Sequence, residues 1–195
     1  IHPEVRETEP GFPVRLTAQL FNGKCGHKFP TGSVEDRIMW LHVEARDAKG
    51  AVYHIPVDAK GFEGEEYTIA SDALAYQDLG DIMQIPDFKG LPRDGVPVGD
   101  RIFRMPYFDS KGRMTICQWN TARLGVDYRI GPRETKTETF TWNLPDTVPE
   151  GTVTVTASLY YAKLVRPVGE FLKVPEDELA PVLVNTATTT FIVYD

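Results

Sequence analysis

The sequence has 195 residues, a formal net charge of −7 and a hydrophobic fraction of 42%. This length predicts one domain, residues 1–195, and an acidic chain without a Lys/Arg cluster argues against a nucleic-acid partner. No apolar run approaches the ~20 residues that a membrane-spanning helix needs, so we expect no transmembrane segment. Because the chain opens at Ile1, we expect a processed product or part of a longer protein.

Most of the chain shows the period-two alternation of β-strands. From Pro13 to Asn22, apolar residues alternate with polar ones, and from Ile38 to Asp47 one face carries the apolar set Met39, Leu41, Val43 and Ala45. The opposite face of that second strand carries Ile38, Trp40, His42 and Glu44. Further strands are expected over residues 51–55, 102–108, 113–119, 135–144, 152–161 and 186–194. Seven or more short strands with Gly, Pro and Asp turns predict an all-β, antiparallel β-sandwich.

Two segments interrupt the alternation. Residues 56–100 are rich in Gly and Pro, and we interpret them as an irregular insertion with a short helix near Ser71–Asp78. An insertion of this length is typically functional or covers a partner. Its apolar content favours a position against a partner. Residues 162–185 form a second irregular connection, with a helical turn expected over residues 166–172.

A candidate binding residue lies in a stiffened loop near the N-terminus. His27 is bounded by Gly26 and Gly32, and Pro30 fixes the backbone inside the loop. Imidazole is the commonest protein ligand for a transition metal or a haem iron. The loop therefore predicts either a haem or metal contact at His27, or a histidine that only stabilises its own turn.

The surrounding motifs carry a resemblance. Gly26–Gly32 reads G-H-K-F-P-T-G, and R-x-x-W-L-x-V and D-A-x-G follow it at residues 37–43 and 47–50. Residues 129–135, 140–145 and 153–161 continue the ordered pattern. Together they resemble the immunoglobulin-like β-sandwich domain associated with multihaem c-type cytochromes, over residues 14–55 and 100–195.

The resemblance implies a role beside haem. It implies that His27 can act as an axial haem ligand and that Phe29 packs on a porphyrin edge. The chain has no C-x-x-C-H motif, so haem c cannot attach to it covalently in the usual way. The resemblance then places the haems in a partner chain, a multihaem c-type cytochrome, or in a missing segment of this one.

Cys25 and Cys117 are the only two cysteines. Three interpretations are open: a disulfide, two free buried thiols, or a metal site that includes His27. We favour the disulfide, which would place the protein in the periplasm, outside the cell or on its surface.

Other chemistry-bearing residues are assigned structural roles. We interpret His42 as a surface or interface residue, and we expect His54 to have no acidic neighbour. Trp119 and Trp142 are expected in the core, and the four methionines are interpreted as packing residues rather than copper ligands.

The sequence predicts a module without catalytic activity. No G-x-S-x-G or S-x-x-K motif supports a nucleophilic enzyme. The favoured function is packing on haems in an extracytoplasmic multihaem electron-transfer assembly. The alternatives are a cell-surface, adhesion-type binding sandwich and a periplasmic copper- or zinc-binding domain.

Overall fold

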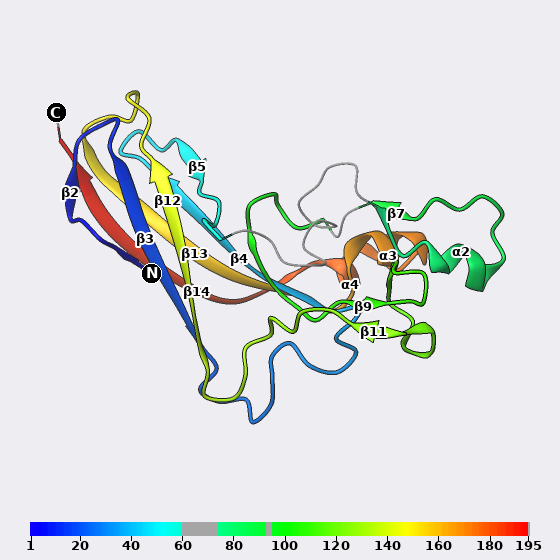
Figure 1. Cartoon of the computed structure of the whole chain (residues 1–195). Coiled ribbons are helices and arrows are strands. Elements are labelled where there is room, and N and C mark those ends of the chain that lie inside the picture. Colours follow the sequence, from blue (N-terminus) through cyan, green and yellow to red (C-terminus); the bar gives the residue numbers. More distant parts are fainter. Residues whose placement is uncertain (60–73, 93–94, 195) are drawn as a thin grey trace.

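The computed structural model describes residues 1–59, 74–92 and 95–194. The chain is mostly β-structure, as expected, and the helices among these residues are short (Figure 1). None of those helices is long and apolar enough to cross a membrane.

Among the four sheets that the described residues form, two make a sandwich, and the smaller of these two has the order β1-β3-β12. Its strands are β1 (His2–Pro3), β3 (Pro13–Phe21) and β12 (Thr135–Asn143). The last two pair antiparallel along their full lengths, from Phe21 opposite Thr135 to Pro13 opposite Asn143. The alternation of β3 predicted its buried face correctly, because Val14 and Leu16 are fully buried.

The larger sheet has six strands in the order β2-β14-β13-β4-β5, and β8 also pairs with β4. The strands are β2 (Glu7–Thr8), β14 (Val182–Val193), β13 (Gly151–Ala162), β4 (Ile38–Arg46), β5 (Val52–His54) and β8 (Arg101–Phe103). Because β13 pairs with β4 from Arg46 to Ile38, β5 and β8 share the other edge of β4.

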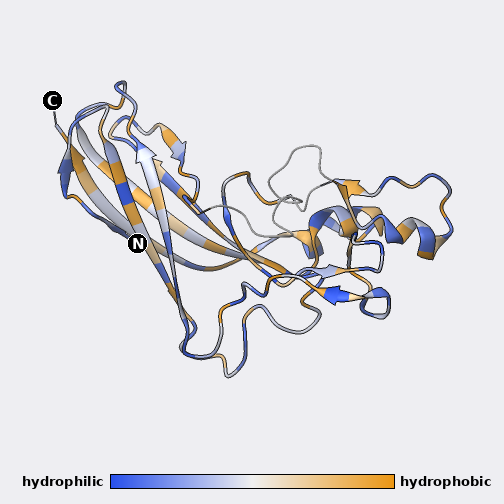
Figure 2. Ribbon diagram, in the orientation of Figure 1, coloured by the Kyte–Doolittle hydropathy of each residue, from blue (hydrophilic) through white to orange (hydrophobic). Residues whose placement is uncertain are grey.

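The two sheets pack face to face around a first core. Figure 2 shows hydrophobic and hydrophilic residues alternating along its long strands. The predicted inner face of β4 supplies Met39, Leu41, Val43 and Ala45, all buried. Trp142 of β12 is buried there as well, as expected.

A second core lies beyond the end of the first, at the right of Figure 1. It uses the opposite face of β4, and its residues are Ile38, Trp40, Ala75, Tyr76, Leu79, Leu91, Val96, Ile102, Phe108, Met114, Cys117, Ala162, Val165 and Val168. The elements around it are β6 (Leu74–Ala75), α2 (Asp78–Met83), β7 (Leu91–Pro92), β9 (Tyr107–Phe108), β10 (Met114–Thr115), η1 (Gln118–Asn120), β11 (Arg123–Leu124), α3 (Arg166–Phe171) and α4 (Glu176–Leu179). The two irregular segments therefore pack against each other.

This second core corrects part of the sequence interpretation. Leu79 and Leu91 of the insertion are buried within this chain, whereas Leu74, Ile82, Met83 and Ile85 are 37–48% exposed, so a position against a partner stays a prediction for the exposed residues. Residues 71–73 of the expected helix lie outside the described ranges, and α2 begins at Asp78. Trp119 is 81% exposed. The expectation of a core position was wrong because a 3₁₀ turn replaces the strand after Cys117, so the alternation no longer applies.

A buried ion pair links the two sheets next to the first core. Arg101 of β8 donates to Glu138 of β12 at 2.9 Å, and the side chains of both residues are almost completely buried. The Tyr128 hydroxyl donates to the other carboxylate oxygen at 2.7 Å, and the guanidinium lies 4.5 Å from the tyrosine ring. Two desolvated charges therefore depend on each other across the sandwich.

We predict that Glu138→Ala lowers the free energy of unfolding by about 3–5 kcal/mol, because it removes the carboxylate that balances a buried guanidinium. Urea denaturation measures the change. Glu150→Ala is the control, since Glu150 is exposed. A loss no larger than that of the control would contradict this account of the ion pair.

Candidate functional site

The predicted His27 loop leaves the end of β3 and returns toward β4. Asn22 holds its first part: the buried side-chain amide donates to the backbone oxygen of His27 at 2.9 Å and to that of Ile130 at 3.1 Å. The amide oxygen of Asn22 accepts from the backbone N–H of Cys25 at 3.1 Å. One side chain therefore fixes two points of the loop and ties them to Ile130.

The second part of the loop is paired to the segment before β12. Phe29 and Ile130 exchange two backbone hydrogen bonds of 2.9 Å. The Phe29 ring packs on the first core and stacks on Tyr161, with 5.9 Å between ring centroids. Part of the Phe29 ring surface is therefore covered by residues of this chain.

An acidic residue outside the loop anchors it from the side. Lys28 donates to Asp127 at 2.7 Å, and Arg129 makes two bonds of 2.8 Å with the same carboxylate. The Arg129 guanidinium and the Lys28 ammonium hold the pKa of Asp127 well below its ordinary value. The carboxylate stays ionised, and the loop stays anchored, at any pH near neutrality.

The His27 imidazole is exposed at the turn of this frame. Its Nδ1 lies 3.1 Å from the backbone oxygen of Lys28. A carbonyl oxygen only accepts, so Nδ1 carries the proton and the lone pair of the neutral ring is on Nε2. Ligating histidines commonly have this arrangement, in which the second nitrogen donates to a carbonyl or a carboxylate.

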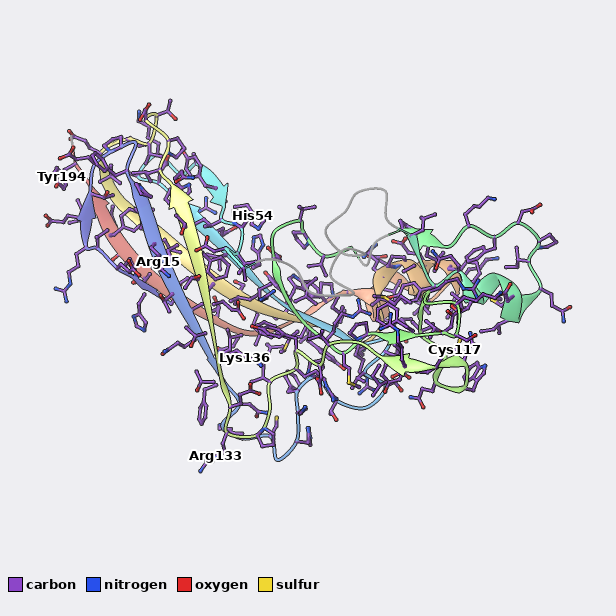
Figure 3. All side chains as sticks on the ribbon, viewed as in Figure 1. Arg15, His54, Cys117, Arg133, Lys136 and Tyr194 are labelled. Carbon is purple, nitrogen blue, oxygen red and sulfur yellow. The ribbon has the colours of Figure 1, made fainter. Side chains whose placement is uncertain are left out.

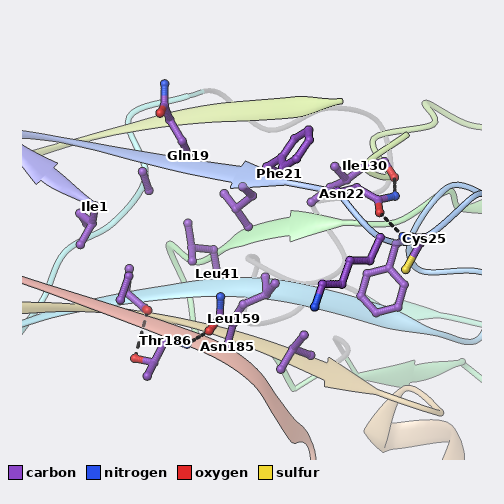
Figure 4. A pocket seen from close by; sticks show the side chains of 18 residues that line it. Ile1, Gln19, Phe21, Asn22, Cys25, Leu41, Ile130, Leu159, Asn185 and Thr186 are labelled. Atoms are coloured by element: carbon purple, nitrogen blue, oxygen red, sulfur yellow. Dashed lines mark hydrogen bonds between the residues drawn. The ribbon is translucent and has the colours of Figure 1, made fainter. Parts of the chain in front are cut away.

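A groove of about 760 Å³ begins beside the loop and runs between the two sheets (Figure 4). Its lining includes Phe21, Cys25, Phe29, Leu41, Leu159 and Val184. Beside it, Val182, Leu183 and Val184 at the start of β14 are 49%, 51% and 43% exposed. An apolar surface of this kind is typical of an interaction site.

The predicted disulfide is wrong, because both cysteines are free. Cys25 is half-buried in the His27 loop, whereas Cys117 is buried in the second core, at the right of Figure 3. Burial, with the charges of Asp78 and Glu35, raises the pKa of the Cys117 thiol. Cys117 is therefore an inert packing residue, and the two cysteines belong to different parts of the fold.

We predict one fast-reacting thiol in the native protein and two after unfolding without reductant. Iodoacetamide reacts with the thiolate. Cys25 should therefore be alkylated first, and Cys117 should be protected by burial and its raised pKa. Mass spectrometry of the alkylated peptides gives the count. Finding no reactive thiol in the unfolded, unreduced protein would restore the disulfide.

A second group of side chains meets where the sequence predicted none. His42 Nδ1 lies 2.9 Å from Asp100 Oδ1, and His54 Nε2 lies 2.7 Å from the same oxygen. The Asp100 side chain is fully buried, and the two rings are stacked with 4.9 Å between centroids. The hydrogen bond with Asp100 raises the pKa of His42. The expectation that His54 has no acidic neighbour was therefore wrong.

Sequence reasoning missed Asn22 and Asp100 for different reasons. Asn22 was predicted as the last residue of a strand that ends at Phe21, and an Asn at the end of a strand is a common turn-forming residue, so a local signal existed. Asp100 is distant in sequence from both histidines, and its position depends on how β8 pairs with β4. Its position beside the histidines could have been predicted only from the pairing of β8 with β4.

Comparisons with known proteins concern the fold. No protein-family model matches the sequence, and neither does any curated protein. Among solved structures, the chain is similar to a penta-haem cytochrome c552 from Thermochromatium tepidum, with a TM-score of 0.57 and 20% sequence identity. The match covers 92% of this chain and 36% of the cytochrome, so the chain spans about a third of that protein's length.

Proposed function

We propose that this chain is an immunoglobulin-like, non-catalytic module of an extracytoplasmic multihaem cytochrome assembly. The observation that carries the proposal is the fold, shared over 92% of the chain with a protein described as a penta-haem cytochrome. The ordered motifs around Gly26–Gly32 support the same family. The single domain, the absence of catalysis and the periplasmic or extracellular location remain predictions within this proposal.

In this proposal, the haem-bearing partner contacts the groove between the sheets and the neighbouring residues Val182–Val184 at the start of β14. The lining of the groove is largely apolar, and Val182, Leu183 and Val184 are 43–51% exposed; a haem edge needs apolar contacts that exclude water. Beyond the pairing of Ile192 and Val193 with β2, no described strand covers the outer edge of β14, so backbone groups are also offered there. A partner seated on this side would have its haem in a medium of lower dielectric, which tunes its reduction potential.

His27 lies at the end of the same side and supplies one axial ligand in this proposal. Its Nδ1 is held by a carbonyl, and Nε2 has no hydrogen bond to any described residue. The loop around it is fixed by Asn22 and Asp127, so little order is lost when Nε2 binds iron. The haem itself, attached elsewhere, would supply the electron transfer; this chain holds, orients and shields it.

We predict that the assembly isolated through this chain shows a Soret band with sharp α and β bands, and that Leu183→Asp lowers its haem content per chain. A buried carboxylate at the apolar contact is costly, which should weaken binding at least tenfold. Val52→Asp is the control, because Val52 is 48% exposed but lies on β5. A colourless wild-type assembly, or an equal effect of both variants, contradicts the proposal.

The axial role is tested separately by His27→Ala in the assembled complex. We predict that one haem changes from low-spin to high-spin and that its potential changes, because an imidazole ligand is lost. Visible and electron paramagnetic resonance spectra measure the spin state. His2→Ala is the control, as His2 is also exposed. An unchanged low-spin spectrum would remove the ligand role and leave the packing role.

A further inference from the structure

We propose that His42, His54 and Asp100 form a binding site for a divalent transition-metal cation, with zinc as the expected ion. The site lies on the larger sheet, on the face of β4 opposite to the first core. Among the described residues, these three are the group of His, Cys, Asp or Glu side chains whose potential ligand atoms all lie within 4.8 Å of one another. The inference is independent of the proposed haem function.

The topology of the sheet creates the convergence. Strand β5 pairs with β4 at residues 44–46, and β8 pairs with the same edge at residues 39–41. His42 lies at the junction between these two pairings. His54 is the last residue of β5 and Asp100 directly precedes β8, so the ends of two strands deliver their side chains to one place on β4.

The donor atoms are close to the spacing that a metal requires. One ligand atom of each residue lies within 4.8 Å of the others. Tetrahedral zinc with bonds of about 2.0–2.1 Å places neighbouring ligand atoms about 3.3 Å apart. The imidazole–carboxylate distances of 2.7 and 2.9 Å are a few tenths of an ångström shorter, because a hydrogen bond joins these atoms. Two of the three spacings are therefore close to those of a ligand set, and all three lie within 4.8 Å before any side-chain movement.

The charge of the site also favours a cation. The Asp100 side chain is fully buried, and its side-chain partners among the described residues are the two histidines. A buried carboxylate needs a balancing positive charge, and a divalent ion bound by the same three side chains would supply it. Two imidazoles and one carboxylate form a ligand set that zinc accepts, with the fourth position left for water.

Neighbouring residues also shape the site. Glu44 Oε2 lies 3.9 Å from His42 Nε2, the ring nitrogen that faces away from Asp100. At this distance the carboxylate does not hydrogen-bond to the ring, but it adds a second negative charge beside the site. Gly99 has a positive φ of 94°, and a Cβ there would lie 2.7 Å from Pro56 Cβ and 3.2 Å from His54 Cε1. Glycine is required where the chain passes His54 this closely.

Isothermal titration of ZnCl₂ into the metal-free protein tests the site. We expect about one equivalent of zinc to bind, and an affinity at least tenfold weaker in His54→Ala. His54 is partly exposed and at the end of its strand, so this variant should keep the fold, which circular dichroism verifies. His2→Ala is the matched control, because His2 is also an exposed histidine, and it should bind zinc as the wild type does.

Cobalt provides a readout that a purely structural triad would not give. Co²⁺ bound by the three residues should show visible d–d bands in the wild type and in His2→Ala, and these bands should be absent in His54→Ala. The proposal is overturned if the folded wild type binds no equivalent of zinc or cobalt. It is also overturned if His54→Ala binds as well as the wild type, or if His2→Ala is the variant that loses binding.

Discussion

The structure depends on β4, a strand whose two faces are buried in different cores. Met39 and Leu41 point into the space between the sheets, whereas Ile38 and Trp40 point into the second core. Both edges are also paired, one by β13 and the other by β5 and β8. A shift of one residue in this strand would exchange the two sets of side chains and disrupt both cores, so its register is strongly fixed.

The pairing along β4 also positions the side chains of the candidate metal site and of the buried ion pair. Two different strands must share one edge of β4, and their ends meet at His42. The same arrangement brings Arg101, next to Asp100, against Glu138 between the sheets. The His27 loop is the first part of the connection between β3 and β4, and Asn22 and Asp127 fix it there. The candidate metal site and the proposed haem contact therefore use different surfaces, and each can be lost without the other.

The sequence predicted the features that depend on neighbouring residues alone. Alternation gave the buried faces of β3 and β4, and the Gly- and Pro-bounded loop was correctly located around His27. Positions that depend on long-range pairing were not predictable in this way. Cys117 enters a second core to which both irregular segments contribute, and Trp119 leaves the expected face at a 3₁₀ turn. Asp100 reaches two histidines only because β8 pairs beside β5, which no single segment encodes.

The central claim is that the His27 side of this chain packs on a haem carried elsewhere. A structure of the native assembly tests it most directly, through the shortest distance between a haem edge and the His27 loop or Val182–Val184. The account predicts van der Waals contact, within about 4 Å, between a haem or its immediate polypeptide and this surface. An assembly in which no haem-bearing polypeptide touches the groove, the loop or the start of β14 would contradict it.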